Sequence, residues 1–217
     1  MTLDDLDATA RTLGLAVRGA FHPEPEDGTP EKAQTLVMLG PDEPAFWMIF
    51  TASPEYQDGA PHPLDRWSKR VTAELAKPLD GTAIFPYDGP PYAPFLNWAL
   101  RSETCWASPV GLLVHSEAGL FISFRAALAL PQHLEPSPRA HSPCSTCEDR
   151  PCETACPVGA LARAQDYDVP ACVAHMTSAK GAACRQGCLV RRACPVSATF
   201  GRLPEQSAFH MRAFLGE

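Results

Sequence analysis

The first 143 residues of this 217-residue chain contain one cysteine, Cys105, and the sequence has no long uninterrupted apolar run. Its most apolar stretch, residues 109–131, is broken by two glycines and by charged side chains, so we expect no membrane-spanning segment and no membrane partner. The acidic start MTLDDLDATARTLG lacks the basic and apolar regions of a secretory signal peptide. The sequence therefore predicts a cytoplasmic protein.

Basic residues are also few, with 18 Lys and Arg against 25 Asp and Glu and a formal net charge of −7. Proteins that hold a phosphate backbone need many Lys or Arg contacts, so this balance predicts no nucleic-acid partner. Glycine-rich loops of the kinds that bind dinucleotides or nucleoside triphosphates are missing too. Nucleotide chemistry therefore has no support in the sequence.

Proline is abundant, at 23 residues, which disfavours long unbroken helices and regular central strands. Apolar runs at 35–39 and 82–87 predict strands, and apolar residues at helical spacing predict an amphipathic helix over 63–75. Two further apolar runs, 110–115 and 120–130, flank a glycine-containing turn and predict a β-hairpin. These elements together predict an α+β fold.

The stretch PQHLEPSPRAHSP, residues 131–143, contains four prolines and little apolar content. Such a composition is typical of an extended connector between domains. We therefore expect an α/β domain over residues 1–130, the connector over 131–143, and a small second domain over 144–217 that ends in a helix.

Eight of the nine cysteines lie between Cys144 and Cys194. They form two runs that end in Cys-Pro pairs, at Cys156 and Cys194, and Cys172 stands between the runs. The segments CPVGA and CPVSA that begin at these Cys-Pro cysteines differ at one position, as expected for a repeat that builds two matched sites. In a reducing compartment, clustered cysteines indicate metal or redox chemistry rather than structural disulfides.

Two [4Fe-4S] clusters would use all eight of these cysteines, because each cluster needs four thiolates. In bacterial two-cluster ferredoxins the Cys-Pro cysteine of each run ligates the other cluster. Applied here, the first cluster takes Cys144, Cys147, Cys152 and Cys194, and the second takes Cys156, Cys172, Cys184 and Cys188. The alternative is a pair of zinc sites with four cysteines each, although zinc gives no reason for the repeated Cys-Pro endings.

The cysteine-rich part resembles the cluster domain of epoxyqueuosine reductases and their relatives among the reductive dehalogenases. The lone Cys172, in YDVPACVAHM, and the compact run after it that ends in Cys-Pro carry this resemblance. The spacings depart from the family pattern, with four residues between Cys147 and Cys152. A weaker similarity covers the upstream segment WASPVGLLVHSEAG, residues 106–119.

This resemblance implies a nitroreductase-like α/β fold for the first domain, as in cobalamin-processing proteins, and a bacterial-ferredoxin-like fold for the second. It also implies a corrinoid site beside the nearer cluster, and it makes Asp88, in the segment DGPP, the candidate catalytic aspartate. The family's helical-repeat substrate domain has no counterpart within residues 1–217, so the resemblance implies no recognition of tRNA.

These residues and this resemblance predict an iron–sulfur redox protein that relays electrons through two [4Fe-4S] clusters to an acceptor held by the first domain. A corrinoid is the acceptor that the resemblance implies, which would make the chain a cobalamin-linked oxidoreductase. Such a protein needs a redox partner or another electron donor. The alternative is an electron-transfer module that catalyses nothing itself and docks on a partner enzyme.

Overall fold

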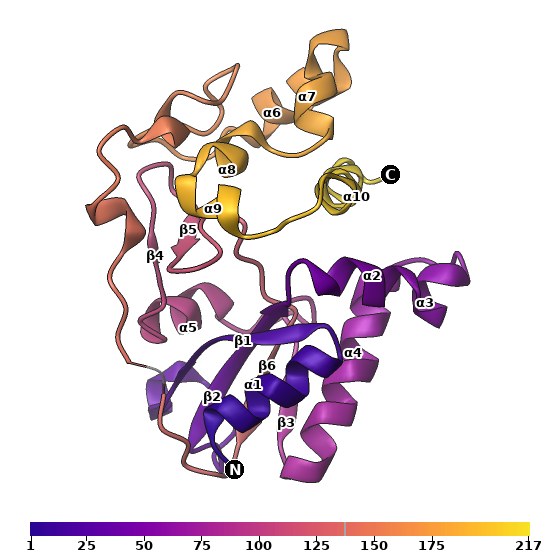
Figure 1. Ribbon diagram of the computed structural model, residues 1–217, viewed down its shortest axis with the longest axis vertical. Helices are drawn as coiled ribbons and strands as arrows, with labels where there is room; N and C mark the ends of the chain where they lie inside the picture. Colours follow the sequence, from indigo (N-terminus) through magenta and orange to yellow (C-terminus); the bar gives the residue numbers. More distant parts are fainter. Residues whose placement is uncertain (137) are drawn as a thin grey trace. The chain divides into compact units, whose positions relative to one another are not determined.

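The computed structural model describes residues 1–136 and 138–217 (Figure 1). Helices and strands are mixed along the chain, so the expected α+β class is confirmed. Within the described residues, no helix combines the length and the apolar character that crossing a membrane requires.

The chain forms two compact units, and each unit contains two separate segments of the sequence. The first unit is Met1–Thr104 with Ser123–Ala140, and the second unit is Cys105–Ile122 with His141–Glu217. Residues 105–122 therefore group with the cysteine-rich segment, whereas the sequence analysis placed them in the first domain.

A four-stranded sheet forms the centre of the first unit. Its strands lie in the order β1 (Leu15–Phe21), β2 (Thr35–Pro41), β6 (Ala126–Leu130) and β3 (Thr82–Ile84), and neighbouring strands are antiparallel. Every residue of the two central strands, β2 and β6, is buried. Burial on both faces of the sheet agrees with the apolar residues 36–39 of β2 and with β6, which is apolar throughout.

The partner of β6 differs from the sequence prediction. We expected residues 120–130 to pair with 110–115 in a hairpin, but β6 pairs with β2 and β3. The hairpin that does form joins β4 (Cys105–Ala107) to β5 (Leu113–His115) in the second unit. Because β6 is apolar at every position, the middle of a four-stranded sheet removes more of its surface from water than a two-stranded hairpin would.

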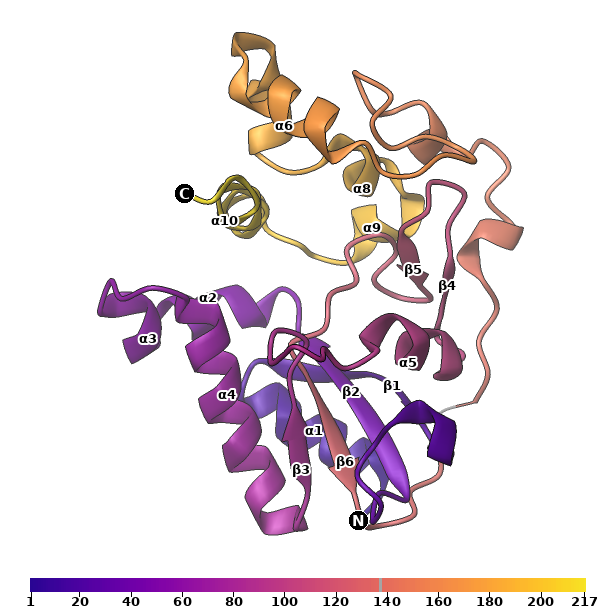
Figure 2. The same ribbon diagram turned by 180° about the vertical axis from the view of Figure 1, so that it is seen from behind.

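The amphipathic helix expected over residues 63–75 forms as α4 (Pro63–Ala76). It packs against β3 and β6, and Figure 2 shows it running beside β3. The Trp67 ring of α4 meets Phe46 and Phe50 from α2 (Ala45–Thr51), with ring centroids 5.3 Å and 5.7 Å away. The first unit also contains α1 (Leu3–Thr12), η1 (Pro25–Asp27), α3 (Pro54–Gln57), η2 (Lys77–Leu79) and α5 (Phe95–Arg101).

The second unit consists of the β4–β5 hairpin and a series of short helices (Figure 1). Its helical segments are η3 (Pro143–Ser145), η4 (Pro151–Glu153), α6 (Val169–Thr177), η5 (Ala179–Gly181), α7 (Ala182–Arg185), α8 (Leu189–Ala193), α9 (Pro195–Thr199) and α10 (Pro204–Leu215). Several of them begin at a proline, as expected for a residue whose fixed φ suits the first helical position. Most of these helices are too short to be stable alone, so tertiary contacts must hold them.

The variant Leu128→Ala is expected to destabilise the first unit. Leu128 lies in β6 and is fully buried, so truncation leaves a cavity and costs about 2–5 kcal/mol of unfolding free energy. Urea denaturation followed by tryptophan fluorescence measures this loss. Leu96→Ala is the matched control, because Leu96 on α5 is 67% exposed, and its cost should stay below about 0.5 kcal/mol. Equal losses in the two variants would contradict the assignment of the core.

Candidate metal centre

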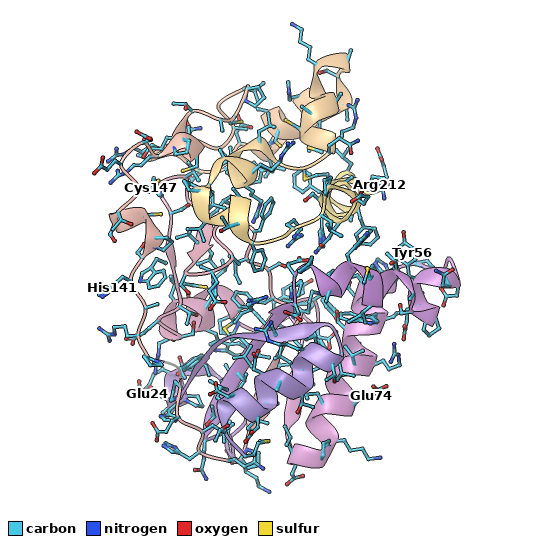
Figure 3. The ribbon with its side chains drawn as sticks, viewed as in Figure 1. Glu24, Tyr56, Glu74, His141, Cys147 and Arg212 are labelled. Carbon is cyan, nitrogen blue, oxygen red and sulfur yellow. The ribbon has the colours of Figure 1, made fainter. Side chains whose placement is uncertain are left out.

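Four thiols of the second unit line one cavity of about 490 Å³. We call them the first thiol group: Cys144, Cys147, Cys152 and Cys194. Cys147, labelled in Figure 3, lies on the loop between η3 and η4. Three of these thiols come from the first cysteine run and one from the end of the second run, so the cavity joins the two runs.

Prolines shape the backbone next to these cysteines. Pro143 and Pro151 begin η3 and η4, directly before Cys144 and Cys152. Cys194 stands between α8 and α9, and Pro195 after it forces the extended conformation seen there, with φ −65° and ψ 123°. The proline thus interrupts the helical path at the residue that contributes its thiol to the cavity.

The turn that follows β5, closed by backbone hydrogen bonds between His115 and Gly119, passes close to this thiol. Gly119 has φ 56°, and a Cβ at this position would lie 3.0 Å from Cys194 Sγ and 2.5 Å from the backbone nitrogen of Ser197. The hydroxyl of Ser197 accepts a hydrogen bond from the backbone N–H of Leu120 at 2.8 Å. Glycine is therefore required at position 119, and Ser197 ties the segment after β5 to α9.

Neither contact was predicted from the sequence, although a signal for one of them was present. Ser197 occupies the single position at which CPVSA differs from CPVGA, where the first copy has Gly159. The single difference between the two copies of the repeat therefore falls on Ser197, which holds the segment after β5. The sequence identified Gly119 as a turn residue. The residues around Gly119 do not indicate that it lies close to Cys194, which is far away in the sequence.

The other four clustered thiols form what we call the second thiol group: Cys156, Cys172, Cys184 and Cys188. Cys172 lies in α6, Cys184 lies in α7, and Cys188 precedes the first residue of α8. Burial raises the pKa of Cys172 and of Cys184, and negative charge on Cys188 and Cys156 raises it further. These thiols are therefore close enough to act on one another.

The pKa values of the first thiol group are raised for the same reasons. Burial raises the pKa of Cys144 and of Cys152, and negative charge on Cys194 and Cys147 raises it further. For these two thiols and for the two of the second group described above, the cysteine charges that act are those of the same group. Four thiolates held this close together need bound cations to offset their repulsion.

Thiols are ligands both for iron–sulfur clusters and for zinc, and the two need different sulfur spacings. Sulfurs around one zinc ion lie about 3.8 Å apart, as follows from tetrahedral bonds of about 2.3 Å. In a cubane each thiolate binds a different iron, so the sulfurs enclose a larger volume. Within the described ranges, no group of three or more His, Cys, Asp or Glu side chains is placed to hold one metal ion.

Asp88 lies in the first unit, and its surroundings are those of a surface residue. The side chain is 50% exposed, and one carboxylate oxygen accepts a hydrogen bond from Lys69 Nζ at 2.7 Å. Lys69 Nζ also lies 5.6 Å and 5.5 Å from the ring centroids of Phe85 and Tyr87. The Tyr87 hydroxyl donates to the backbone oxygen of Asp65 at 2.9 Å. These contacts stabilise the loop, and a catalytic role for Asp88 stays a prediction.

Comparison with known proteins gives one finding. No family model and no curated protein matches the chain. Among solved structures, the chain is similar to a crystal structure of epoxyqueuosine reductase with a tRNA-Tyr epoxyqueuosine-modified tRNA stem loop, with a TM-score of 0.51 and 15% identity. The match covers 94% of this chain and 69% of that one. The resemblance to epoxyqueuosine reductases is thereby confirmed at the level of the fold.

The same finding corrects our expectation that the chain has no nucleic-acid partner, because the protein with this fold was solved with a tRNA stem loop. The expectation rested on the formal net charge of −7. Net charge is a sum over the whole chain, whereas phosphates are bound by local groups of Arg and Lys. An acidic total therefore does not exclude such a partner.

The variant Gly119→Ala is expected to lose the metal bound at the first thiol group and to keep that at the second. An added Cβ would displace Cys194 or the backbone of Ser197, and φ 56° strains any side chain. Iron and zinc per chain, measured on the purified protein, test this expectation. Gly111→Ala is the matched control, since Gly111 also has positive φ, 76°, but open space around its Cβ position. Equal metal loss in both variants would show that backbone strain alone is responsible.

Proposed function

We propose that the chain is an iron–sulfur redox protein that holds two [4Fe-4S] clusters and passes electrons through them to an acceptor. The first thiol group holds one cluster and the second thiol group holds the other. The fold likeness to an epoxyqueuosine reductase supports a redox function.

The exchange of the two Cys-Pro cysteines carries this proposal. Cys194, from the end of the second run, lines the cavity of Cys144, Cys147 and Cys152. Cys156, from the end of the first run, acts on Cys172 and Cys184 instead. This grouping supports the cross-ligation known from two-cluster ferredoxins, in which each run completes the site of the other.

A bound [4Fe-4S] cluster accepts and donates one electron at a time. The residues of this chain hold it and control access of water to it. Val114, Leu120 and Val190 belong to an apolar core that also contains Cys152 and Cys194. A dry, apolar wall lowers the local dielectric constant, which strengthens every electrostatic interaction with the cluster and tunes its potential.

The side chains of the first unit do not support a corrinoid site. Trp67 and Trp98, which a cofactor pocket could have used, are each 1% exposed and belong to the core. The indole N–H of Trp98 donates to the backbone oxygen of Asp27 at 2.9 Å. Asp88 is paired with Lys69. The corrinoid that the resemblance implies is therefore not used in any step proposed here.

The second candidate function is an electron-transfer module whose first unit positions it against a partner and catalyses nothing itself. Titration of the loaded protein with cobalamin separates the two candidates. A change in the visible spectrum of the corrinoid that saturates with protein would favour a cobalamin-linked reductase. An unchanged spectrum would favour the module, and binding of the same protein to a tRNA stem loop would then identify RNA as a partner.

Purified without oxygen, the chain is expected to contain about eight irons and about eight acid-labile sulfides. Cys194→Ala and Cys156→Ala should each lose about four irons, because each removes one ligand of one cubane. Zinc in place of iron in the wild-type protein would contradict the proposed function.

Double variants test the exchange of ligands between the runs. Cys194→Ala combined with Cys147→Ala removes two ligands of one proposed cluster, so it should lose no more iron than either single variant. Cys194→Ala combined with Cys184→Ala removes two cysteines of the same run but of different proposed clusters, so it should lose nearly all iron. The opposite result would mean that each run binds its own cluster. Cys105→Ala, at the buried cysteine outside both groups, is the control and should keep all iron.

A further inference from the structure

The segment that carries most of the second thiol group is basic throughout. Residues 169–203 contain one Lys and four Arg and no Asp or Glu, although the chain as a whole is acidic. Three cysteines of the group, Cys172, Cys184 and Cys188, lie in this segment. A [4Fe-4S] cluster with its four thiolates carries about −2 when oxidised, so the five cations of the segment outnumber that charge.

Three of the arginines bind backbone oxygens. Arg185 Nη1 donates to the backbone oxygen of Met176 and, at 3.1 Å, to that of Ser178, at the end of α6. Arg191 and Arg202 donate to backbone oxygens of the segment after β5. Because a carbonyl has no net charge, these bonds hold the guanidinium groups in place without neutralising them.

Arg185 lies close to two thiols of the second group. It follows Cys184 in α7, and the sulfur of Met176, whose backbone oxygen it binds, lies 3.9 Å from Cys172 Sγ. Helices α6 and α7 also contact each other (Figure 1). The positive charge of Arg185 is therefore held between the two helices that carry these thiols.

The other two cations, Lys180 and Arg192, are exposed. Lys180 lies in η5, which packs against α6 and α7. Arg192 lies in α8 one turn after Cys188, and its Cδ lies 3.5 Å from the point where a Cβ of Gly187 would stand. Across residues 1–136 and 138–217, neither cationic side chain forms an ion pair or a hydrogen bond. Both charges therefore face solvent beside the second thiol group.

Two carboxylates precede this segment, at the other end of α6. Asp166 and Asp168 are exposed, and Asp168 accepts a hydrogen bond from the backbone N–H of Ala171 at 2.9 Å. The nine residues of α6 separate them from η5 by about 13 Å. Because the Debye length at physiological ionic strength is about 8 Å, their charges are largely screened at Lys180.

The surroundings of the first thiol group have the opposite sign. The exposed residues Glu148 and Asp149 line its cavity together with the thiols. Arg150 lines the cavity too, but it lies 3.7 Å from a carboxylate oxygen of Glu153, which offsets its charge. An acidic partner is therefore repelled at the first group and attracted at the second.

An electron donor must bring its own redox centre close to the cluster that it reduces. Resting on the proposed function, we propose that an acidic one-electron donor protein docks on the surface of Lys180 and Arg192 and reduces the second cluster. The donor is oxidised by one electron, the cluster is reduced by that electron, and no bond forms or breaks. Electron-transfer complexes are small and transient, and opposite charges steer their encounter.

RNA fits this surface less well than an acidic protein does. A nucleic-acid site commonly neutralises about six to ten phosphates. Of the five cations in residues 169–203, only Lys180 and Arg192 are both exposed and without an ion pair or hydrogen bond among the described residues. Two such cations are enough to steer a donor protein but too few to hold an RNA backbone.

The double variant Lys180→Glu with Arg192→Glu is expected to slow reduction by a plant-type [2Fe-2S] ferredoxin of net negative charge about tenfold. Stopped-flow absorbance measures the rate at about 0.1 M ionic strength, where a Debye length of about 10 Å screens the distant acidic residues. Near 1 M the Debye length is about 3 Å, so the variant and the wild type should agree within about twofold.

The matched control is Lys32→Glu with Lys77→Glu. Both lysines are exposed and lie in the first unit, and their replacement changes the net charge by the same amount. The control should change the rate at about 0.1 M by less than about twofold, because the steering charges at the docking surface are intact.

Reduced methyl viologen, a cation, separates docking from damage to the cluster. It should reduce the double variant Lys180→Glu with Arg192→Glu at least as fast as the wild type, because the added carboxylates attract it. Slower reduction by both donors would overturn the inference, since the substitutions would then alter the cluster itself. If the double variant binds less iron than the wild type, Lys180→Glu alone decides the question, with an expected slowing by ferredoxin of about threefold.

Equal rates with ferredoxin for the two double variants would overturn the inference. A tRNA stem loop that binds the wild type but not Lys180→Glu with Arg192→Glu, at an unchanged ferredoxin rate, would also overturn it and assign the surface to RNA. Fewer than about eight irons in the wild-type chain would instead show that the proposed function itself is wrong.

Discussion

Repulsion among closely placed, at least half-buried thiolates is the constraint on which the second unit depends. Within each thiol group, the negative charge of one cysteine raises the pKa of its neighbours, so several can ionise together only when cations bind. The apolar core of Val114, Leu120 and Val190 also contains Cys152 and Cys194, so the core and the candidate metal site are one region. Most helices of the second unit are too short to be stable alone. Their stability therefore depends on the side chains, and on any metal, bound in this region.

The sequence was informative where a signal was local. The period of the apolar residues predicted α4, which is confirmed. The two Cys-Pro endings predict that Cys194 and Cys156 exchange places between the runs, and this ligand assignment stays a prediction. Prediction failed where a strand could pair with more than one distant strand. An all-apolar strand such as β6 fits a hairpin or a sheet centre equally well until the rest of the sheet is present to cover it.

Close packing between distant segments could also not be predicted from the sequence. The need for glycine at position 119 arises from the Cys194 thiol, which lies far along the chain. The formal net charge gave a wrong prediction about nucleic-acid partners for a related reason. A sum over all residues contains no information about where on the surface the charges lie. Arg150 and Arg191 illustrate the difference. Both are arginines near cysteines in the sequence, but Arg150 forms an ion pair with Glu153, whereas Arg191 donates to the backbone oxygen of Leu120.

The exchange of cysteines between the two runs has a consequence for synthesis of the chain. Cys144, Cys147 and Cys152 leave the ribosome well before Cys194, which completes their group, and Cys156 waits in the same way for Cys184 and Cys188. Neither group of four exists until most of the chain has been made. On the proposed function, the early thiols would have to stay reduced during this interval, and metal loading would wait until the segment that ends at Cys194 has been made and folded.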